Sequence, residues 1–207
     1  MEQCLTLFSV WSPPHRWPPL RLQIMELEQN KYYHLYNRSN NHELLFRNRD
    51  NYIYFLSKYK KYLSPFVNTL AYCLMPDHFH FSVYVKSNDS ITLKKSIGLL
   101  LSSYTKAINK SFSRVGSLFQ QHTKTKLIVD DKSLLTVISY IHQNPKKKSL
   151  VSNLEDWEFS SYGDYLGLRN GTLVDKTFIR KNFTSIEAFK LFSLSKVEKN
   201  NFIYDLH

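Results

Sequence analysis

The stretch FVNTLAYCL-MPD-HFHFSVYVK, residues 66–86, decides the fold. Two runs rich in apolar and aromatic residues flank the turn residues 75–77, which is typical of a β-hairpin. Successive side chains of a strand point to opposite faces, so we expect His78 and His80 together on one face and Phe79 in a core on the other. Two imidazoles side by side can form half of a divalent metal site. An exposed polar strand face has the same pattern, so a metal site needs a further ligand elsewhere.

The segments around this hairpin alternate or repeat in ways that predict the remaining elements. The expected order is a strand over 31–37, a helix over 49–63, strands over 66–74 and 78–86, a helix over 91–112, an extended segment over 117–129, and a helix over 132–144 ended by Pro145. The order strand, helix, strand, strand, helix, strand is that of an α+β fold, a ferredoxin-like split βαβ sandwich with an antiparallel sheet.

We expect one domain over residues 25–170 with a segment on either side. Residues 1–24 contain four prolines and no basic leader, so they predict a poorly ordered N-terminal extension rather than a signal peptide. Residues 171–207 are polar and mixed, and we expect a helical C-terminal appendage there. No apolar segment is long enough to cross a bilayer, which favours a cytoplasmic, nucleoid-associated protein.

The chain is strongly basic, with 28 Lys and Arg against 17 Asp and Glu and a formal charge of +11. Such an excess attracts polyanions, and an aromatic content of 15% suits stacking on unpaired bases. A soluble basic protein without a nucleic-acid partner would have the same composition. The two cysteines are too few for a disulfide framework or a zinc knuckle. The candidate phosphate contacts are Lys94, Lys95, Lys106, Lys110, Arg114, Lys124, Lys126, Lys146, Lys147 and Lys148.

A second set of chemically capable residues lies near the end of the last predicted helix. Tyr140 and Asn144 are four residues apart, so they share a helix face. They offer a nucleophile beside an amide oxygen, a ligand type that Mg²⁺ and Mn²⁺ accept. Tyr104 is a rival tyrosine, but Asn109 is five residues from it and lies off its face. Tyr140 is therefore the favoured nucleophile.

Several motifs resemble those of the REP-associated tyrosine transposases, single-tyrosine members of the HUH superfamily. The runs that carry the resemblance are YHLYNRSNN at 33–41, MPDHFH at 75–80 and YIHQNP at 140–145, and two further similar stretches are RVGSLFQ at 114–120 and DWEFSSY at 156–162. The resemblance covers about residues 30–168, with the motifs in the family's order.

The resemblance implies a ferredoxin-like fold and a metal-dependent transposase that cleaves and rejoins single-stranded DNA. Carried over by motif, His78, His80 and Asn144 would hold Mg²⁺ or Mn²⁺, and Tyr140 would form a covalent 5′-phosphotyrosine link. The expected substrate is single-stranded DNA with a hairpin of the repeat type, bound by a monomer or homodimer.

The chain departs from the family pattern at three positions. Ser39 and Ser149 stand where glycine is usual, and Asp77 stands where asparagine is common. None of these changes removes a ligand or the nucleophile. Two alternatives share the motifs: a domesticated or inactive relative that only binds hairpin DNA, and a replication or conjugation relaxase, which usually has a larger partner domain.

Overall fold

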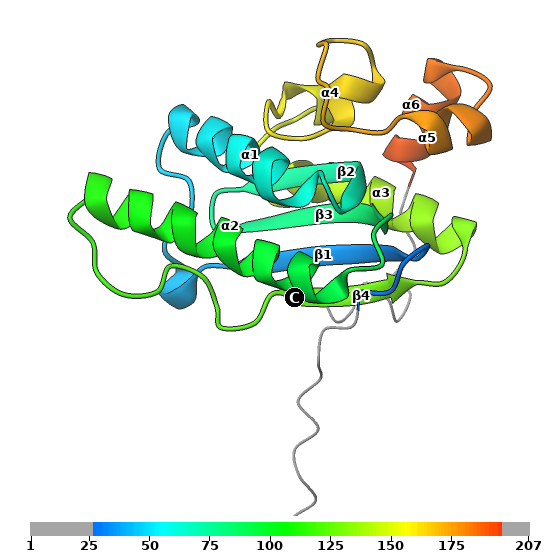
Figure 1. Ribbon diagram of the computed structural model, residues 1–207. Helices are drawn as coiled ribbons and strands as arrows, with labels where there is room; N and C mark the ends of the chain where they lie inside the picture. Colours follow the sequence, from blue (N-terminus) through cyan, green and yellow to red (C-terminus); the bar gives the residue numbers. More distant parts are fainter. Residues whose placement is uncertain (1–26, 196–207) are drawn as a thin grey trace, which may run out of the picture.

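The protein is described by a computed structural model over residues 27–195, so the predicted extension over 1–24 lies outside the described part (Figure 1). Four strands form one sheet in the order β2-β3-β1-β4 with antiparallel neighbours. Their bounds are Tyr32–Arg38 for β1, Val67–Met75 for β2, His78–Val85 for β3 and Lys124–Ile128 for β4. The expected ferredoxin-like strand and helix order is confirmed.

The hairpin that decided the fold is the β2–β3 pair, and its register fixes which residues share a face. His80 lies opposite Cys73 of β2 and opposite Tyr36 of β1. Phe79 and its neighbour Phe81 point to the other face, where both side chains are buried. The predicted alternation along β3 is therefore confirmed.

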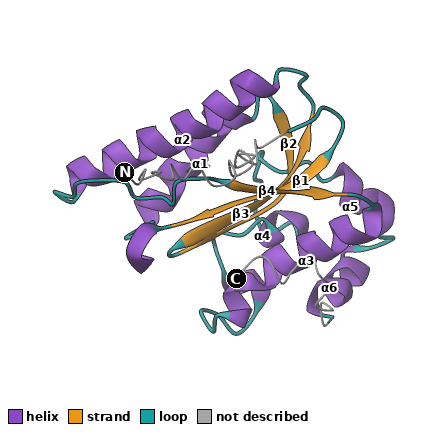
Figure 2. Cartoon of the chain, turned by 90° about the horizontal axis from the view of Figure 1, so that it is seen from below, coloured by secondary structure: helices purple, strands orange, loops and turns teal. Residues whose placement is uncertain are grey.

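Three long helices cover the two faces of the sheet, as Figure 2 shows, with α1 and α2 on one side and α3 on the other. Their bounds are Arg49–Leu63 for α1, Ser90–Ser111 for α2 and Asp131–Lys147 for α3. Each is preceded by an N-cap Asn or Asp whose side chain accepts a hydrogen bond from a backbone N–H of the first turn. Such caps supply a hydrogen-bond acceptor for a backbone N–H of the first turn, which has no acceptor within the helix.

Each face of the sheet has its own apolar core. On the α1–α2 side, Tyr33, Leu35, Phe79 and Phe81 join the buried faces of both helices. On the α3 side, the apolar contribution of the sheet comes mainly from β2, for example Ala71 and Cys73. Strands β1 and β3 place polar side chains on that side instead, and this leaves a polar region beneath the C-terminal half of α3.

One predicted boundary is wrong. Helix α3 does not end at Pro145 but continues to Lys147, and the N–H of Lys148 donates to the carbonyl of Asn144. Pro145 has no N–H, so this turn of the helix lacks one i→i−4 hydrogen bond. Within the segment expected to be extended over 117–129, residues 124–128 form β4. Before β4, Phe119 forms an isolated antiparallel bridge with Ser39, flanked by backbone hydrogen bonds from Asn40 to Leu118 and from Gln120 to Arg38.

The expected helical appendage over 171–207 is helical in its described part, up to residue 195, where it contains α5 (Thr177–Asn182) and α6 (Ile186–Leu194). Two more short helices, η2 (Leu154–Asp156) and α4 (Tyr162–Tyr165), precede it, and all four pack on the α3 side, while η1 (Asn40–His42) follows β1. Ile179 and Phe189 of this region belong to the same core as α3. Over residues 27–195, no helix is both long and apolar enough to span a bilayer.

Candidate active site

A cavity of about 490 Å³ opens where the C-terminal part of α3 crosses the polar region of the sheet. The lining comes from strands β1, β2, β3 and β4, from the β2–β3 turn, from the loop before β4 and from α3. Its members are Tyr36, Asn37, Arg38, Met75, Pro76, Asp77, His78, His80, Gln120, His122, Lys124, Tyr140, Asn144, Lys148 and Leu150. The structure thus brings His78, His80, Tyr140 and Asn144 to one cavity from two distant parts of the sequence.

The two histidines of β3 lie together, with ring centroids 5.0 Å apart. His78 is partly exposed, and its Nδ1 lies 2.6 Å from Oδ1 of Asp77. This hydrogen bond lowers the pKa of Asp77, so the carboxylate stays ionised beside the ring. With the carboxylate at Nδ1, Nε2 is the nitrogen of His78 that could ligate a cation, an arrangement common at metal sites.

His80 lies deeper, with 2% of its surface exposed, and a third imidazole that the sequence analysis missed lies against it. His34 of β1 is completely buried, and its Nε2 is 3.0 Å from Nδ1 of His80. Burial, aided by the charge of Lys126, lowers the pKa of His34 to about 3, so this ring is neutral. The alternation of β1 could have placed His34 and Tyr36 on one face, but the pairing of β1 with β3 is not visible in local sequence.

Tyr140 and Asn144 project from successive turns of α3 toward the histidines. The Tyr140 ring lies edge-on to His80, with centroids 5.7 Å apart. Burial raises the pKa of its phenol, and the neighbouring Asn144 side chain opposes this shift. The Nζ of Lys147 lies 5.1 Å from the centre of the Tyr140 ring, where its charge favours the phenolate.

The rival tyrosine is on the other side of the sheet. Tyr104 is completely buried in the α1–α2 core, and its hydroxyl donates to the carbonyl of Leu45. None of the cavity-lining residues lies beside it on α2. Of the two tyrosines considered from sequence, only Tyr140 faces the histidines.

The basic residues predicted to contact DNA divide into two groups. Lys94, Lys95, Lys106 and Lys110 lie on α2, on the side away from the cavity, while Lys124 and Lys148 line the cavity. Lys126 lies on β4, and Lys146 and Lys147 lie in the last turn of α3. The DNA contact of each remains a prediction, but among these residues only Lys124 and Lys148 line the cavity.

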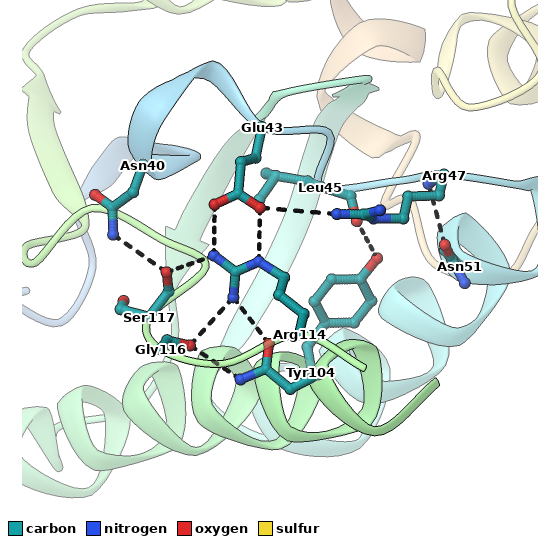
Figure 3. A network of polar contacts seen from close by, with 10 residues as sticks. Asn40, Glu43, Leu45, Arg47, Asn51, Tyr104, Arg114, Gly116 and Ser117 are labelled. Atoms are coloured by element: carbon teal, nitrogen blue, oxygen red, sulfur yellow. Dashed lines mark hydrogen bonds and ion pairs between the residues drawn. The ribbon is translucent and has the colours of Figure 1, made fainter. Parts of the chain in front are cut away.

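Arg114 follows α2 in the chain and lies at the centre of a network of polar contacts (Figure 3). Its Nε and Nη2 donate to the two carboxylate oxygens of Glu43, and its other donors reach Asn109 and the carbonyls of Gly116 and Ser117. All five N–H donors of the guanidinium are thereby used. A phosphate contact would require breaking one of these bonds, so the geometry favours a structural role for Arg114.

The residues around the cavity fit a divalent cation. Within residues 27–195, no three histidine, cysteine or acidic side chains converge as a metal site, and the candidate third ligand is the amide oxygen of Asn144. Asn144 is 3% exposed and lies beside the Tyr140 phenol, with Nδ2 buried without a hydrogen-bond partner among the described residues. Two imidazoles and an amide oxygen are a donor set that Mn²⁺ accepts, and Mg²⁺ accepts the oxygen most readily.

A ferredoxin-like sheet with two strand histidines facing a helix tyrosine across a cavity is the arrangement expected of a single-tyrosine HUH protein. The sequence matches the family described as "Transposase IS200 like" over residues 27–144, more than half of the chain. The chain belongs to this family.

Two relatives extend the comparison. A Haemophilus influenzae protein that carries the name of a REP-associated tyrosine transposase is 31% identical over 119 residues, an alignment that covers 52% of this chain and 66% of that protein, just under two thirds of its length. A solved structure of the REP-associated tyrosine transposase bound to a REP hairpin has a similar fold. Its TM-score is 0.54 at 18% identity, covering 72% of this chain and 90% of the other.

Proposed function

We infer that the chain cleaves and rejoins single-stranded DNA through a covalent bond between Tyr140 and a 5′-phosphate. The observation that carries this proposal is the cavity, where Tyr140 of α3 meets His78 and His80 of β3. A protein that only bound DNA would not need a tyrosine, two imidazoles and an amide in one cavity.

In the proposed reaction, the Tyr140 oxygen attacks the scissile phosphorus. A bond forms between that oxygen and phosphorus, the bond from phosphorus to the 3′-oxygen breaks, and the departing 3′-oxygen takes up a proton. The reverse attack by a 3′-hydroxyl restores the phosphodiester and releases the tyrosine. The covalent link conserves the energy of the broken bond, so rejoining the strands needs no ATP.

The phenol of Tyr140 must lose its proton to become an effective nucleophile. Burial opposes this loss, while Lys147 over the ring and Asn144 beside the phenol favour the ionised form. His78, His80 and Asn144 would hold Mg²⁺ or Mn²⁺, which would neutralise the scissile phosphate and polarise it for attack. Asp77 orients His78 through the hydrogen bond with its Nδ1.

The substrate that we propose is single-stranded DNA with a hairpin beside the cleavage point. The named relatives support this substrate class: one is called REP-associated, and the other is described bound to a REP hairpin. Lys124 and Lys148 line the cavity and can contact the phosphates on either side of the scissile bond.

The test is a covalent-adduct assay with hairpin-bearing single-stranded oligonucleotides from the repeats that flank the gene, in the presence of Mn²⁺. The wild-type chain should form a gel-shifted product that survives denaturation, and Tyr140→Phe should abolish it while leaving DNA binding intact. Tyr104→Phe is the matched control, because Tyr104 is likewise a buried tyrosine on a long helix but lies on the other side of the sheet, where its hydroxyl donates to the carbonyl of Leu45. An adduct that persists in Tyr140→Phe would overturn the assignment.

A domesticated relative that binds hairpin DNA without cutting it is the second candidate, and the basic charge supports it equally. Binding that persists in a chelator, with no adduct in Mn²⁺ from any oligonucleotide of the flanking repeats, would establish it over strand cleavage.

A further inference from the structure

Arg38 is a cation of the cavity lining that the proposed reaction does not use. It is the last residue of β1, and the pairing of β1 with β3 places it directly opposite His78. Side chains two residues apart on a strand share a face, so Arg38 shares its face with Tyr36, whose ring centroid lies 5.9 Å from that of His80. Arg38 therefore lines the cavity beside His78, the more exposed of the two proposed histidine ligands.

The backbone of Arg38 is held in place, whereas most of its side-chain donors are available. Its N–H donates to Oδ1 of Asn37, and its carbonyl accepts from the N–H of Gln120. Among the described residues, its guanidinium has one hydrogen-bond partner, Nδ1 of His42, which accepts from Nη2 at an exposed position. A guanidinium carries five N–H donors, so most of those of Arg38 can bind a ligand in the cavity.

The charge of Arg38 also lacks a close carboxylate partner. Within residues 27–195, the arginines that do form ion pairs are Arg47, Arg49, Arg114 and Arg169. The carboxylate nearest in effect is Asp77, whose pKa is lowered mainly by the hydrogen bond with His78 and to a lesser extent by the charge of Arg38. Two positive charges in one cavity repel each other, so a metal ion at the histidines and the Arg38 guanidinium together favour an anion bound between them.

We propose that Arg38 is a catalytic residue that donates hydrogen bonds to the non-bridging oxygens of the scissile phosphate. This role rests on the proposed function, because it concerns the same phosphate. A guanidinium presents paired donors in a fixed geometry that matches phosphate, which an ammonium group does not. Such donors stabilise the charge of a transferring phosphoryl group in the transition state. Arg38 only donates hydrogen bonds, so the bonds that form and break remain those of the proposed reaction.

The first test measures DNA binding without cleavage. The scissile phosphate is located from the wild-type adduct and is then replaced by a methylphosphonate, which carries no charge. In Tyr140→Phe with EDTA present, this replacement should weaken binding of the hairpin oligonucleotide about 10-fold, since a hydrogen bond between charged groups is lost. In the double variant Tyr140→Phe/Arg38→Ala it should have little effect, because the group that contacts that charge is already absent.

Two results of this binding test would overturn the proposal. One is an equal loss of affinity in both proteins when the scissile phosphate is replaced. The other is a difference between the two proteins that appears instead with a methylphosphonate at the neighbouring phosphate, since Arg38 would then contact the flanking backbone. The proposal expects that neighbouring replacement to affect both proteins equally.

The second test measures the rate of adduct formation with Mn²⁺ at saturating DNA. Arg38→Ala should lower this rate about 100-fold or more, the usual cost of removing a donor to the charge of a transition state. Arg38→Lys should recover part of the loss, because it keeps the charge but not the paired donors. Circular dichroism checks folding, and Arg38→Lys replaces the alanine variant if that variant does not fold. A wild-type rate in the folded variant would overturn the proposal.

The matched control is Arg180→Ala. Arg180 is exposed on α5, and like Arg38 it has no ion-pair partner among the described residues, but it is not part of the cavity lining. Its replacement should leave the rate and the effect of the methylphosphonate unchanged. If the wild-type chain forms the Tyr140 adduct and Arg38→Ala forms it equally fast, the role of Arg38 alone fails. If the wild-type chain forms no adduct, the proposed function fails and this role fails with it.

Discussion

Asp77 lines the cavity and contacts one of the two proposed histidine ligands. Its Oδ1 lies 2.6 Å from Nδ1 of His78. Asp77→Ala should weaken Mn²⁺ binding about 10-fold or more, because His78 loses the partner that orients its ring. Asp77→Asn keeps an oxygen acceptor but not the charge, so its loss of Mn²⁺ affinity should be smaller. Chelator competition measures the Mn²⁺ affinity of both variants, with Asp131→Ala, at an exposed position, as control. Equal affinity in all three variants would refute the role of Asp77 in orienting His78.

Among single residues, those that belong to the sequence motifs were predicted, whereas a residue that contacts them from another strand was not. His78 and His80 were predicted on one face from local alternation, and the register confirms it. His34 was missed although its own strand alternates equally clearly, because its contact with His80 depends on which strands pair. A pairing across 46 positions of sequence leaves no local signal.

At the scale of the element, the Arg114–Glu43 cluster holds the loop before β4 in place (Figure 3). The Arg114 side chain is 11% exposed and bidentate to Glu43. Arg114→Met should lower the free energy of unfolding by about 2–3 kcal/mol, since it removes charged hydrogen bonds and leaves loop carbonyls unpaired. Urea unfolding measures this loss. Arg49→Met is the control, because its pair with Glu158 is exposed and screened by solvent, so its loss should change the free energy of unfolding far less.

The same cluster gives a pH dependence with a definite sign. The hydrogen bond from Arg114 lowers the pKa of Glu43 below 4.5, the ordinary value. Its stabilising contribution is therefore present above the unfolded pKa and lost as pH falls through the lower folded value. Glu43→Gln should show a smaller loss of stability between pH 6 and pH 3 than the wild type. If Glu43→Gln loses as much stability between pH 6 and pH 3 as the wild type, the stabilising role of the Glu43–Arg114 pair is contradicted.

Elements with a local sequence signal were predicted well. Segments whose conformation depends on contacts with residues distant in the sequence were not. The helix over 49–63 was located correctly, because its periodicity and its stop at Ser64-Pro65 are local signals. The segment over 117–123 was predicted as extended, but its contacts were not. Backbone hydrogen bonds join residues 118 and 120 to residues 40 and 38, and the Asn40 and Arg114 side chains donate to the carbonyls of residues 116, 117 and 119. The continuation of α3 past Pro145 likewise reflects packing, because every residue from Val137 to Pro145 is buried.

For the whole molecule, the sheet separates the positive charge into two populations. The lysines of α2 lie on the side away from the cavity, and Lys124 and Lys148 lie at the cavity itself. If cleavage occurs at Tyr140, the phosphates nearest the reaction pass on the α3 side. Charge on α2 then acts only at longer range, where salt at physiological strength screens it within about 8 Å.

The salt dependence of DNA binding distinguishes the two populations. Each lysine that contacts a phosphate of single-stranded DNA contributes about 0.7 to the slope of log affinity against log salt. Lys124→Ala and Lys148→Ala should each reduce that slope by about this amount, whereas Lys95→Ala, on the exposed face of α2, should leave it unchanged. Fluorescence anisotropy with one hairpin oligonucleotide at several salt concentrations measures all three.

Lys132→Ala is the control within α3, because Lys132 lies 16 residues, or about 24 Å, from Lys148 along the helix axis. A reduced slope in Lys95→Ala with none in the cavity variants would place the DNA on the α1–α2 side and separate binding from the proposed active site.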